Sequence, residues 1–233
     1  SREIFPKFKI DLGFIERRMW GYAYLNRGLS LQLNGQKFYS RNGLRDFIEK
    51  EINDEKLYDV IYHRDNTIEF GFCHTPNYGE NYYSYVNGQY TNDGGTHQQA
   101  FREGILKGVN DYAGKNFDGS DVRDGLFGAV AVKIKEPIFE SQTKNKLGNT
   151  EIRTEVVSKV KTFLTDFLSC NLENSLFLLL KIFFFPIVIT LYIWGFNSFA
   201  FGSVVIICSY LIKELSIFLN NAFLCSPFLF NFL

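Results

Sequence analysis

Hydrophobic and polar positions follow two different periods along the first two thirds of the chain. Four segments repeat apolar residues at helical spacing and predict amphipathic helices: 11–25, 44–52, 96–112 and 152–167. Three shorter segments have the apolar pattern of strands: 29–33, 68–72 and 126–134. The segment 76–89 is rich in Tyr, Asn and Gly, and we expect it to combine a loop with an edge strand. Helices interleaved with strands predict an α+β fold.

Local signals mark the ends of these elements. Asn34-Gly35 follows the first predicted strand and is a strong β-hairpin signal. Thr96 and Gln99 have the spacing of a capping box, in which two side chains satisfy free N–H groups of the first helical turn. Gly114 stands where a helix end favours a left-handed residue. These signals predict a hairpin near the start of the chain and a sharply bounded helix over 96–112.

Charge divides the chain into two unlike parts. The sequence has 25 basic and 25 acidic residues and no net charge, so any contact with nucleic acid has to be local. Beyond Lys181 the only charged residues are Lys213 and Glu214. The first part therefore resembles an ordinary globular domain, and residues 177–233 form an apolar tail. The four cysteines have no CxxC spacing and favour neither a zinc site nor a disulfide framework.

Two short phrases carry candidate phosphate chemistry. Gly94-Gly95-Thr96 precedes a helix, whose free N–H groups could hold an anion, although a plain turn and cap is the commoner meaning. Gln142 and Lys144 follow a predicted strand, and in an extended loop their amide and ammonium would point the same way. Such a pair suits a terminal phosphate, and a solvated polar loop is the alternative.

The remaining polar candidates favour structural roles. His97 has no side chain placed to activate it, so we expect a hydrogen-bonded structural residue. His63 and His74 fall in predicted loops and are assigned no role. Asp121 and Asp124 flank Arg123 and predict a local ion pair rather than a hydrolase site. The aromatic residues of segments 68–72 and 82–85 could stack on bases, but core packing is the preferred interpretation.

Three phrases in one order resemble a known family. They are Gly94 to Phe101, Asp121 to Leu126, and Gln142-Thr143-Lys144, preceded by a helix over Arg17 to Gly28. Together they resemble the transducer region of the ATPase subunit of bacterial type IIA DNA topoisomerases, gyrase B and topoisomerase IV B. The resemblance extends from about Ile4 to about Leu176. Asp124 replaces the Glu that is usual in the family, and the sequence around Arg102 is closer to that of topoisomerase IV B.

The resemblance implies a fold and a division of the chain. Residues 1–28 are expected to end a GHKL-type ATPase domain, and residues 29–176 to form a two-layer α/β transducer sandwich with a ribosomal-protein-like fold. The apolar tail over 177–233 is not part of this resemblance, and its own apolar pattern predicts helix. Because the chain starts at Ser1 and its first residues look internal, we expect a fragment of a longer protein.

The resemblance also implies the chemistry of the site. Gln142 and Lys144 would bind the γ-phosphate of ATP, with Lys144 as the catalytic, charge-stabilising residue, and Arg102 would face DNA. The water-activating Glu and the ligands of Mg²⁺ would lie upstream, so this segment holds no metal and is expected to be inactive alone. Implied partners are DNA, a second copy of the subunit and the DNA-cleaving A-type subunit. The expected location is the cytoplasm, at the nucleoid.

The tail leaves alternatives open. The absence of charge between Lys181 and Lys213 is compatible with a membrane hairpin over Ile182–Phe196 and Phe201–Ile212. The family has no membrane segment there, so frameshifted or non-native sequence is the preferred interpretation. Two other functions remain: a membrane-anchored, non-catalytic α+β module, and the transducer of a different GHKL ATPase.

Overall fold

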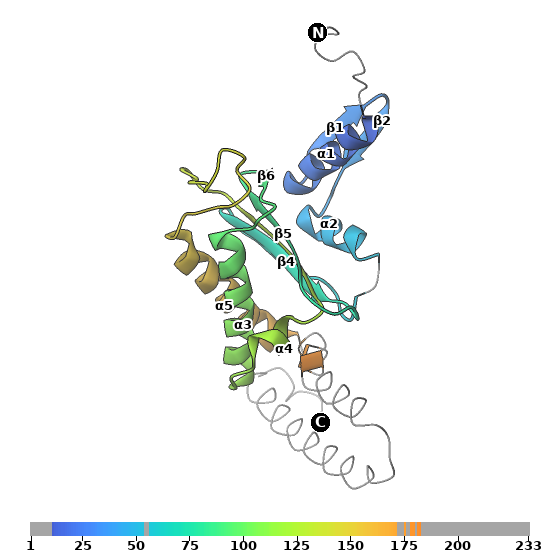
Figure 1. Cartoon of the computed structure of the whole chain (residues 1–233). Helices are drawn as coiled ribbons and strands as arrows, with labels where there is room; N and C mark the ends of the chain where they lie inside the picture. The colour runs from blue at the N-terminus through green and yellow to red at the C-terminus, as the bar shows by residue number, and fades with distance from the viewer. Residues whose placement is uncertain (1–10, 54–55, 172–174, 176–177, 180, 183–233) are drawn as a thin grey trace.

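The computed structural model describes residues 11–53, 56–171, 175, 178–179 and 181–182. It combines helices with a mixed sheet, which confirms the predicted mixed α/β character (Figure 1). The helices are α1 (Leu12–Leu25), α2 (Leu44–Glu51), α3 (Thr96–Ala113), α4 (Gly119–Arg123) and α5 (Ile152–Cys170). The strands are β1 (Ser30–Leu33), β2 (Gln36–Tyr39), β3 (Ile61–Arg64), β4 (Ile68–His74), β5 (Asn81–Val86), β6 (Gln89–Tyr90) and β7 (Leu126–Val132).

The elements with the strongest local patterns lie where the sequence predicts them. Helices α1, α2, α3 and α5 match the four predicted segments, and β1 and β2 form the predicted hairpin. Its turn residues Asn34 and Gly35 have φ values of 50° and 85°, the left-handed conformation that a two-residue hairpin turn needs. Gly114 caps α3 with φ 63°. Strand β3 and helix α4 were not predicted, because each is too short to show a period.

The main sheet has the order β3-β4-β7-β5-β6. Strand β4 pairs antiparallel with β3 and β7, whereas β5 runs parallel to β7, with Tyr82 opposite Gly128. The prediction of an edge strand within 76–89 is wrong for β5, which lies between β7 and the two-residue β6. Its tyrosines are compatible with this inner position because their rings pack along the sheet, as Tyr83 does against Phe127 at 5.6 Å between centroids.

Strand β4 is buried along its whole length because helices cover both faces of the sheet. Phe70 and Phe72 lie against Phe101 of α3, with ring centroids 5.6 and 6.2 Å apart. On the opposite face, a Cβ built on Gly71 would lie 2.9 Å from Ile48 of α2. The two-layer expectation therefore describes the α3 and α5 side alone, and α2 adds a layer over β4 (Figure 1).

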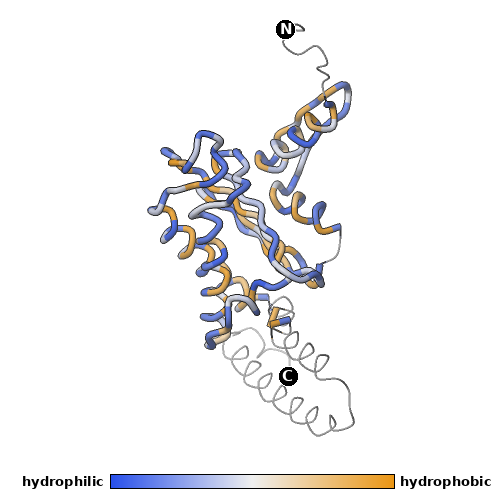
Figure 2. Tube along the Cα trace, in the orientation of Figure 1, coloured by the Kyte–Doolittle hydropathy of each residue, from blue (hydrophilic) through white to orange (hydrophobic). Residues whose placement is uncertain are grey.

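Helices α3 and α5 pack closely through two glycines. A Cβ on Gly104 would lie 2.7 Å from Val160, and a Cβ on Gly108 would lie 3.0 Å from Leu164. The absence of side chains at these positions lets the two backbones approach, so the helices form one tight layer. Apolar residues recur along these helices and the strands beneath them (Figure 2), as expected for elements that share one core.

Two histidines predicted to lie in loops are in strands. His63 is in β3, which is too short to show a period, and His74 is in β4, which extends two residues beyond the predicted strand. The His74 ring is fully buried, with Nδ1 2.5 Å from the Tyr58 hydroxyl and Nε2 2.8 Å from the Val122 carbonyl. The expectation that the aromatic residues form core rather than a stacking platform is confirmed by their mutual packing.

The described part of the tail joins the core. Leu178 and Ile182 are 0% and 3% exposed, and the Lys181 ammonium donates to the Asp121 and Asp124 carbonyls at the end of α4. None of the helices among the described residues is long and apolar enough to cross a membrane. The frameshift interpretation of 177–233 and the membrane hairpin over Ile182–Phe196 and Phe201–Ile212 fall mostly on 183–233, which lie outside the described residues.

Candidate functional site

Residues 138–148 form an arm that carries Gln142 and Lys144 at its tip. The Gly148 N–H donates to the Ile138 carbonyl at 2.8 Å, and the Glu140 N–H donates to the Lys146 carbonyl at 3.1 Å. Phe139 and Leu147 form an antiparallel bridge between the two legs. These contacts fix the base of the arm and leave its tip, including Gln142 and Lys144, exposed to solvent.

The tip is a turn, so the prediction of an extended loop is wrong. The Lys144 N–H donates to the Ser141 carbonyl at 3.0 Å, and Lys144 has a left-handed φ of 57°. The Ser141 and Thr143 hydroxyls lie 2.7 Å apart inside the turn. The structure brings Gln142 and Lys144 to the same tip through this turn rather than through i, i+2 spacing along a strand. The Lys144 ammonium lies 6.0 Å from the Phe139 ring centroid.

The second leg of the arm pairs with the start of α3. The Asp93 N–H donates to the Asn145 carbonyl at 3.0 Å, and the Thr96 N–H donates to the Leu147 carbonyl at 3.1 Å. In return, the Leu147 N–H donates to the Gly94 carbonyl at 3.2 Å. We call this pairing of 93–96 with 145–147 the joint. The Leu147 side chain is fully buried beneath it.

The joint shows what role the Gly-Gly-Thr residues have in the structure. Gly95 is the N-cap of α3 and no side chain caps this helix, so the predicted capping box of Thr96 and Gln99 is wrong. The Thr96 hydroxyl is buried without a hydrogen bond. The physical reason is that Leu147 supplies the acceptor that the Thr96 N–H needs. One N–H group of this helix start is thus already used by protein, which argues for a turn and against an anion site.

Arg102 lies further along α3 and is held by Glu80. Its Nη2 donates to Glu80 Oε1 at 2.9 Å, and Arg123 Nε donates to the same oxygen at 3.2 Å. The Arg102 guanidinium also lies 5.4 Å from the Tyr82 ring centroid. Two guanidiniums share one carboxylate, so this cluster keeps a net charge of about +1. Burial opposes ionisation of Glu80, but its contacts with Tyr82 and the two arginines lower the pKa of that carboxyl.

Arg123 does not form the predicted ion pair with its neighbours in sequence. It reaches Glu80 instead, while Asp124 Oδ1 accepts a hydrogen bond from the Gly79 N–H at 2.8 Å. Helix α4 is short and its Asp124 adopts an extended conformation, so the Asp124 side chain turns toward the loop before β5. Both contacts tie α4 to residues 79–80, more than forty positions earlier in the chain.

His97 has the structural role expected of it. The ring is fully buried, and Nε2 lies 3.4 Å from the Thr91 hydroxyl. Burial lowers the pKa of His97 to about 4, so the ring is neutral near pH 7. Its Nδ1 is buried without a hydrogen bond. The Thr91 hydroxyl that faces this neutral ring donates to the Ser84 carbonyl at 2.9 Å, so the pair is not arranged for proton transfer.

Among the described residues, no group of three or more His, Cys, Asp or Glu could hold a metal ion. A groove of about 260 Å³ lies between the end of β7 and the start of α5. Its floor includes Ile68, Val132 and Val156, and its rim includes Lys133 and Glu155. This groove is separate from the exposed tip that carries Lys144.

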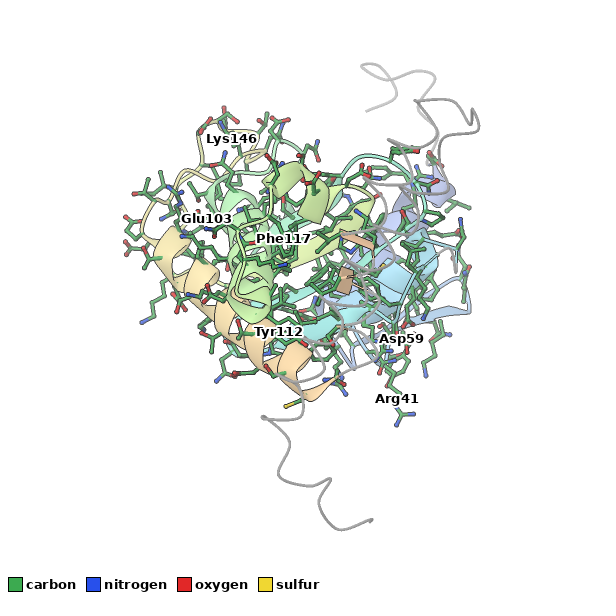
Figure 3. The ribbon with its side chains drawn as sticks, turned by 90° about the horizontal axis from the view of Figure 1, so that it is seen from below. Arg41, Asp59, Glu103, Tyr112, Phe117 and Lys146 are labelled. Atoms are coloured by element: carbon green, nitrogen blue, oxygen red, sulfur yellow. The ribbon has the colours of Figure 1, made fainter. Side chains whose placement is uncertain are left out.

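Figure 3 shows how the candidate residues are distributed in space. Glu103 of α3 and Lys146 of the arm lie on one side of the molecule, whereas Arg41 and Asp59 lie on the other, beside α2. The joint and the first half of α3 therefore belong to the same side. The sequence names Gln142, Lys144 and Arg102 as candidates but does not point to Glu80 or Leu147. No local signal marks these two, because their partners are distant in sequence.

Comparison with known proteins places this geometry in a family. The family model of DNA gyrase B matches residues 43–184. The B subunit of DNA topoisomerase 4 from Borreliella burgdorferi is 52% identical over 167 residues, which are 71% of this chain and 28% of the relative. The B subunit of DNA gyrase from Clostridium acetobutylicum is 31% identical over 191 residues, 72% of this chain and 30% of the relative. The chain thus spans less than a third of these relatives.

Solved structures agree. The 43K ATPase domain of Thermus thermophilus gyrase B, in complex with an aminocoumarin, is 30% identical with a TM-score of 0.66, covering 78% of this chain and 55% of that one. The topoisomerase IV ATP-binding domain of Francisella tularensis has the same fold, with a TM-score of 0.64 at 22% identity over 76% of this chain and 53% of that one. The matched phrases, the fold and the family model lead to one conclusion: this chain belongs to the DNA gyrase B family.

Proposed function

We propose that this chain is the transducer segment of the ATP-hydrolysing subunit of a type II DNA topoisomerase, in which ATP binding and hydrolysis drive DNA strand passage. In this proposal residues 1–28 end the ATPase domain and residues 29–176 form the transducer. The family match and the likeness to solved ATPase domains support it. The identity of 52% to a topoisomerase 4 relative, against 31% to a gyrase relative, favours a topoisomerase IV parent.

The exposed tip of the arm is the observation that carries the nucleotide part of the proposal. Gln142 offers amide N–H donors and Lys144 offers an ammonium, both on a turn held by a fixed base. When ATP is hydrolysed, charge shifts onto the oxygens of the departing γ-phosphoryl group. A cation and polar donors placed in advance stabilise that charge. Lys144 is therefore proposed as the catalytic residue, with Gln142 as a second ATP contact.

The other parts of the ATP chemistry belong to the longer protein. Mg²⁺ bridges phosphate oxygens in such reactions and needs oxygen ligands. The described residues offer no cluster that could bind it. The water-activating base is likewise proposed to lie outside this chain, so the chain alone should not hydrolyse ATP. Measurable turnover by the isolated chain would contradict this assignment.

The test of Lys144 uses a chimera. Residues 11–171 replace the matching segment of the Borreliella burgdorferi topoisomerase 4 relative, and ATP turnover is measured. Lys144→Ala should lower kcat about 100-fold, the usual effect of losing one group that stabilises transition-state charge. Lys146→Ala is the matched control, because that lysine lies in the same arm but pairs with Glu140 at 3.0 Å. Equal turnover for Lys144→Ala and the parent chimera would refute the proposed role.

The proposal also assigns DNA contact to Arg102. Its side chain is 38% exposed and belongs to the net positive cluster with Glu80 and Arg123. Arg102→Gln should weaken DNA binding about equally across sequences and lower the salt dependence by about one ion. Lys107→Gln is the control, because Lys107 lies on the same helix but pairs with Glu103. An unchanged salt dependence for Arg102→Gln would remove this contact from the proposal.

Further partners follow from the parent protein. We infer that it acts with a second copy of the ATPase subunit and with a DNA-cleaving A-type subunit, at the nucleoid in the cytoplasm. Family membership argues against a membrane-anchored module unrelated to topoisomerases and against a different GHKL ATPase. Size-exclusion chromatography of the chimera with a nonhydrolysable ATP analogue should show a dimer, and a monomer would contradict the first of these partners.

A further inference from the structure

We propose that Gly95 is the positioning residue for Lys144, because its backbone packs directly against Leu147 in the leg of the arm that follows Lys144. The inference deepens the proposed function and rests on the role of Lys144 in it. The Gly-Gly-Thr phrase contacts Leu147, in the leg of the arm rather than at its tip. Its effect is transmitted through the joint, which links the start of α3 to the leg of the arm next to Lys144.

The joint holds the arm from one side only. Its three backbone hydrogen bonds all involve residues 145–147, the leg that follows Lys144. The leg that precedes the tip is attached to the other leg, through Glu140 to Lys146 and Gly148 to Ile138. The backbone of the arm is therefore fixed through the leg that rests on Gly94 and Thr96, and the Phe139 side chain of the other leg packs against the core.

The conformation of Gly95 and the contact above it both require glycine. Its φ of 130° and ψ of −165° lie in a region that is essentially closed to other residues. A Cβ at this position would lie 2.5 Å from both the nitrogen and the carbonyl oxygen of Leu147. Any side chain at position 95 must push the leg of the arm away from α3. Lys144 is three residues from Leu147, so a shift at the base moves the tip.

Helix α3, which carries one side of the joint, is tightly packed. Helix α3 is packed against α5 through Gly104 and Gly108, and the Leu147 side chain is fully buried in the core. The start of α3 therefore cannot follow a displaced arm without disturbing that packing. A displacement of about 1 Å at a catalytic group is enough to reduce a rate about 100-fold. A shift of the leg should therefore displace Lys144 and lower turnover, because α3 does not move with it.

The test is a double-mutant cycle on ATP turnover in the chimera described above. Gly95→Ala should lower kcat about 10-fold or more while Lys144 is present. In a Lys144→Ala background the same substitution should change kcat by less than about 2-fold, because the group it positions is already gone. The ATP concentration at half-maximal rate should stay nearly constant, since the main nucleotide contacts are proposed to lie outside this chain.

Two further variants separate positioning from stability. Gly114→Ala places a side chain on another left-handed glycine at the far end of α3, where no atom lies within 4 Å of the added Cβ. Its φ of 63° and ψ of 23° are less restrictive than those of Gly95, so the added side chain should strain the backbone more weakly and leave kcat unchanged. Leu147→Ala loosens the joint by removing the buried side chain beneath it. It should reproduce the background-dependent loss, and it decides the question if Gly95→Ala does not fold.

The outcomes distinguish this inference from the proposed function. If Gly95→Ala and Leu147→Ala lower kcat equally in both backgrounds, they do not act through Lys144, and the inference is wrong while the role of Lys144 stands. If Lys144→Ala itself leaves turnover unchanged, the proposed function fails, and the inference fails with it. A loss confined to the Lys144 background supports both.

Discussion

The buried ring of His74 makes a quantitative prediction about acid stability. The ring lies between the Tyr58 hydroxyl and the Val122 carbonyl, and the other ionisable groups around it are Cys73 and Lys181. Burial, aided by the Lys181 ammonium, lowers the pKa of His74 from 6.5 to about 3. The folded protein therefore keeps this ring neutral at pH values where the unfolded chain binds a proton.

The sign and size follow from proton linkage. Because the folded pKa is the lower one, the stabilising effect is complete above pH 6.5 and is lost as the pH falls from 6.5 toward 3. Each pH unit in this window removes about 1.4 kcal/mol. At pH 5, one and a half units below the unfolded value, His74 should therefore lower the free energy of unfolding by about 2 kcal/mol.

The assay compares the chain with its His74→Gln variant by urea unfolding at pH 8 and at pH 5. Glutamine can retain polar contacts with Tyr58 and Val122 but does not titrate. The cost of the substitution should shrink by about 2 kcal/mol between pH 8 and pH 5, since only the parent loses stability there. Tyr58→Phe removes one partner and should keep the full pH dependence. A His74→Gln cost that is the same at both pH values would refute the reasoning.

Three further outcomes are expected in urea unfolding. Asp65→Asn should cost about 1–3 kcal/mol near pH 7, because the carboxylate accepts hydrogen bonds from Lys159 and from two backbone N–H groups. These contacts lower the pKa of Asp65, so the cost should vanish in strong acid, and a cost independent of pH would contradict the reasoning. Gly108→Ala should cost about 1–3 kcal/mol by crowding Leu164, and a stabilised variant would show that α3 and α5 can separate freely. Phe101→Ala should cost about 3–5 kcal/mol, since the ring is fully buried against Phe70, Phe72 and Tyr82, and a cost below 1 kcal/mol would mean that the core collapses around the gap.

Local patterns were sufficient for most of the elements. The 3.6-residue period of α3 and α5 and the Asn34-Gly35 turn are each contained within one short segment, so the sequence predicts them correctly. The place of β5 could not be found in this way. Its parallel pairing with β7 depends on how the intervening chain crosses the sheet, and nothing in the composition of β5 records that path.

The candidate site likewise contains residues with a local sequence signal and residues whose partners are distant in sequence. Gln142 and Lys144 stand out because their phrase is local, and family resemblance gives them a role that remains to be tested. Their turn conformation was missed because Ser141 and Thr143 close it through contacts that leave no periodic signal. Glu80 was missed because its two arginines arrive from α3 and α4. The capping box failed at Thr96 because a distant backbone segment took the place of the expected side chain.

The parallel pairing of β5 with β7 determines when the main sheet can form during synthesis of the chain. Strand β5 leaves the ribosome well before β7, with β6, α3 and α4 between them. Until Leu126–Val132 emerges, the middle of the sheet is missing, and Phe70 and Tyr82 are without the strand that separates them. Such a long-range closure slows folding and exposes apolar surface in the meantime. A nascent chain of this protein is thus expected to be a client of chaperones until its seventh strand arrives.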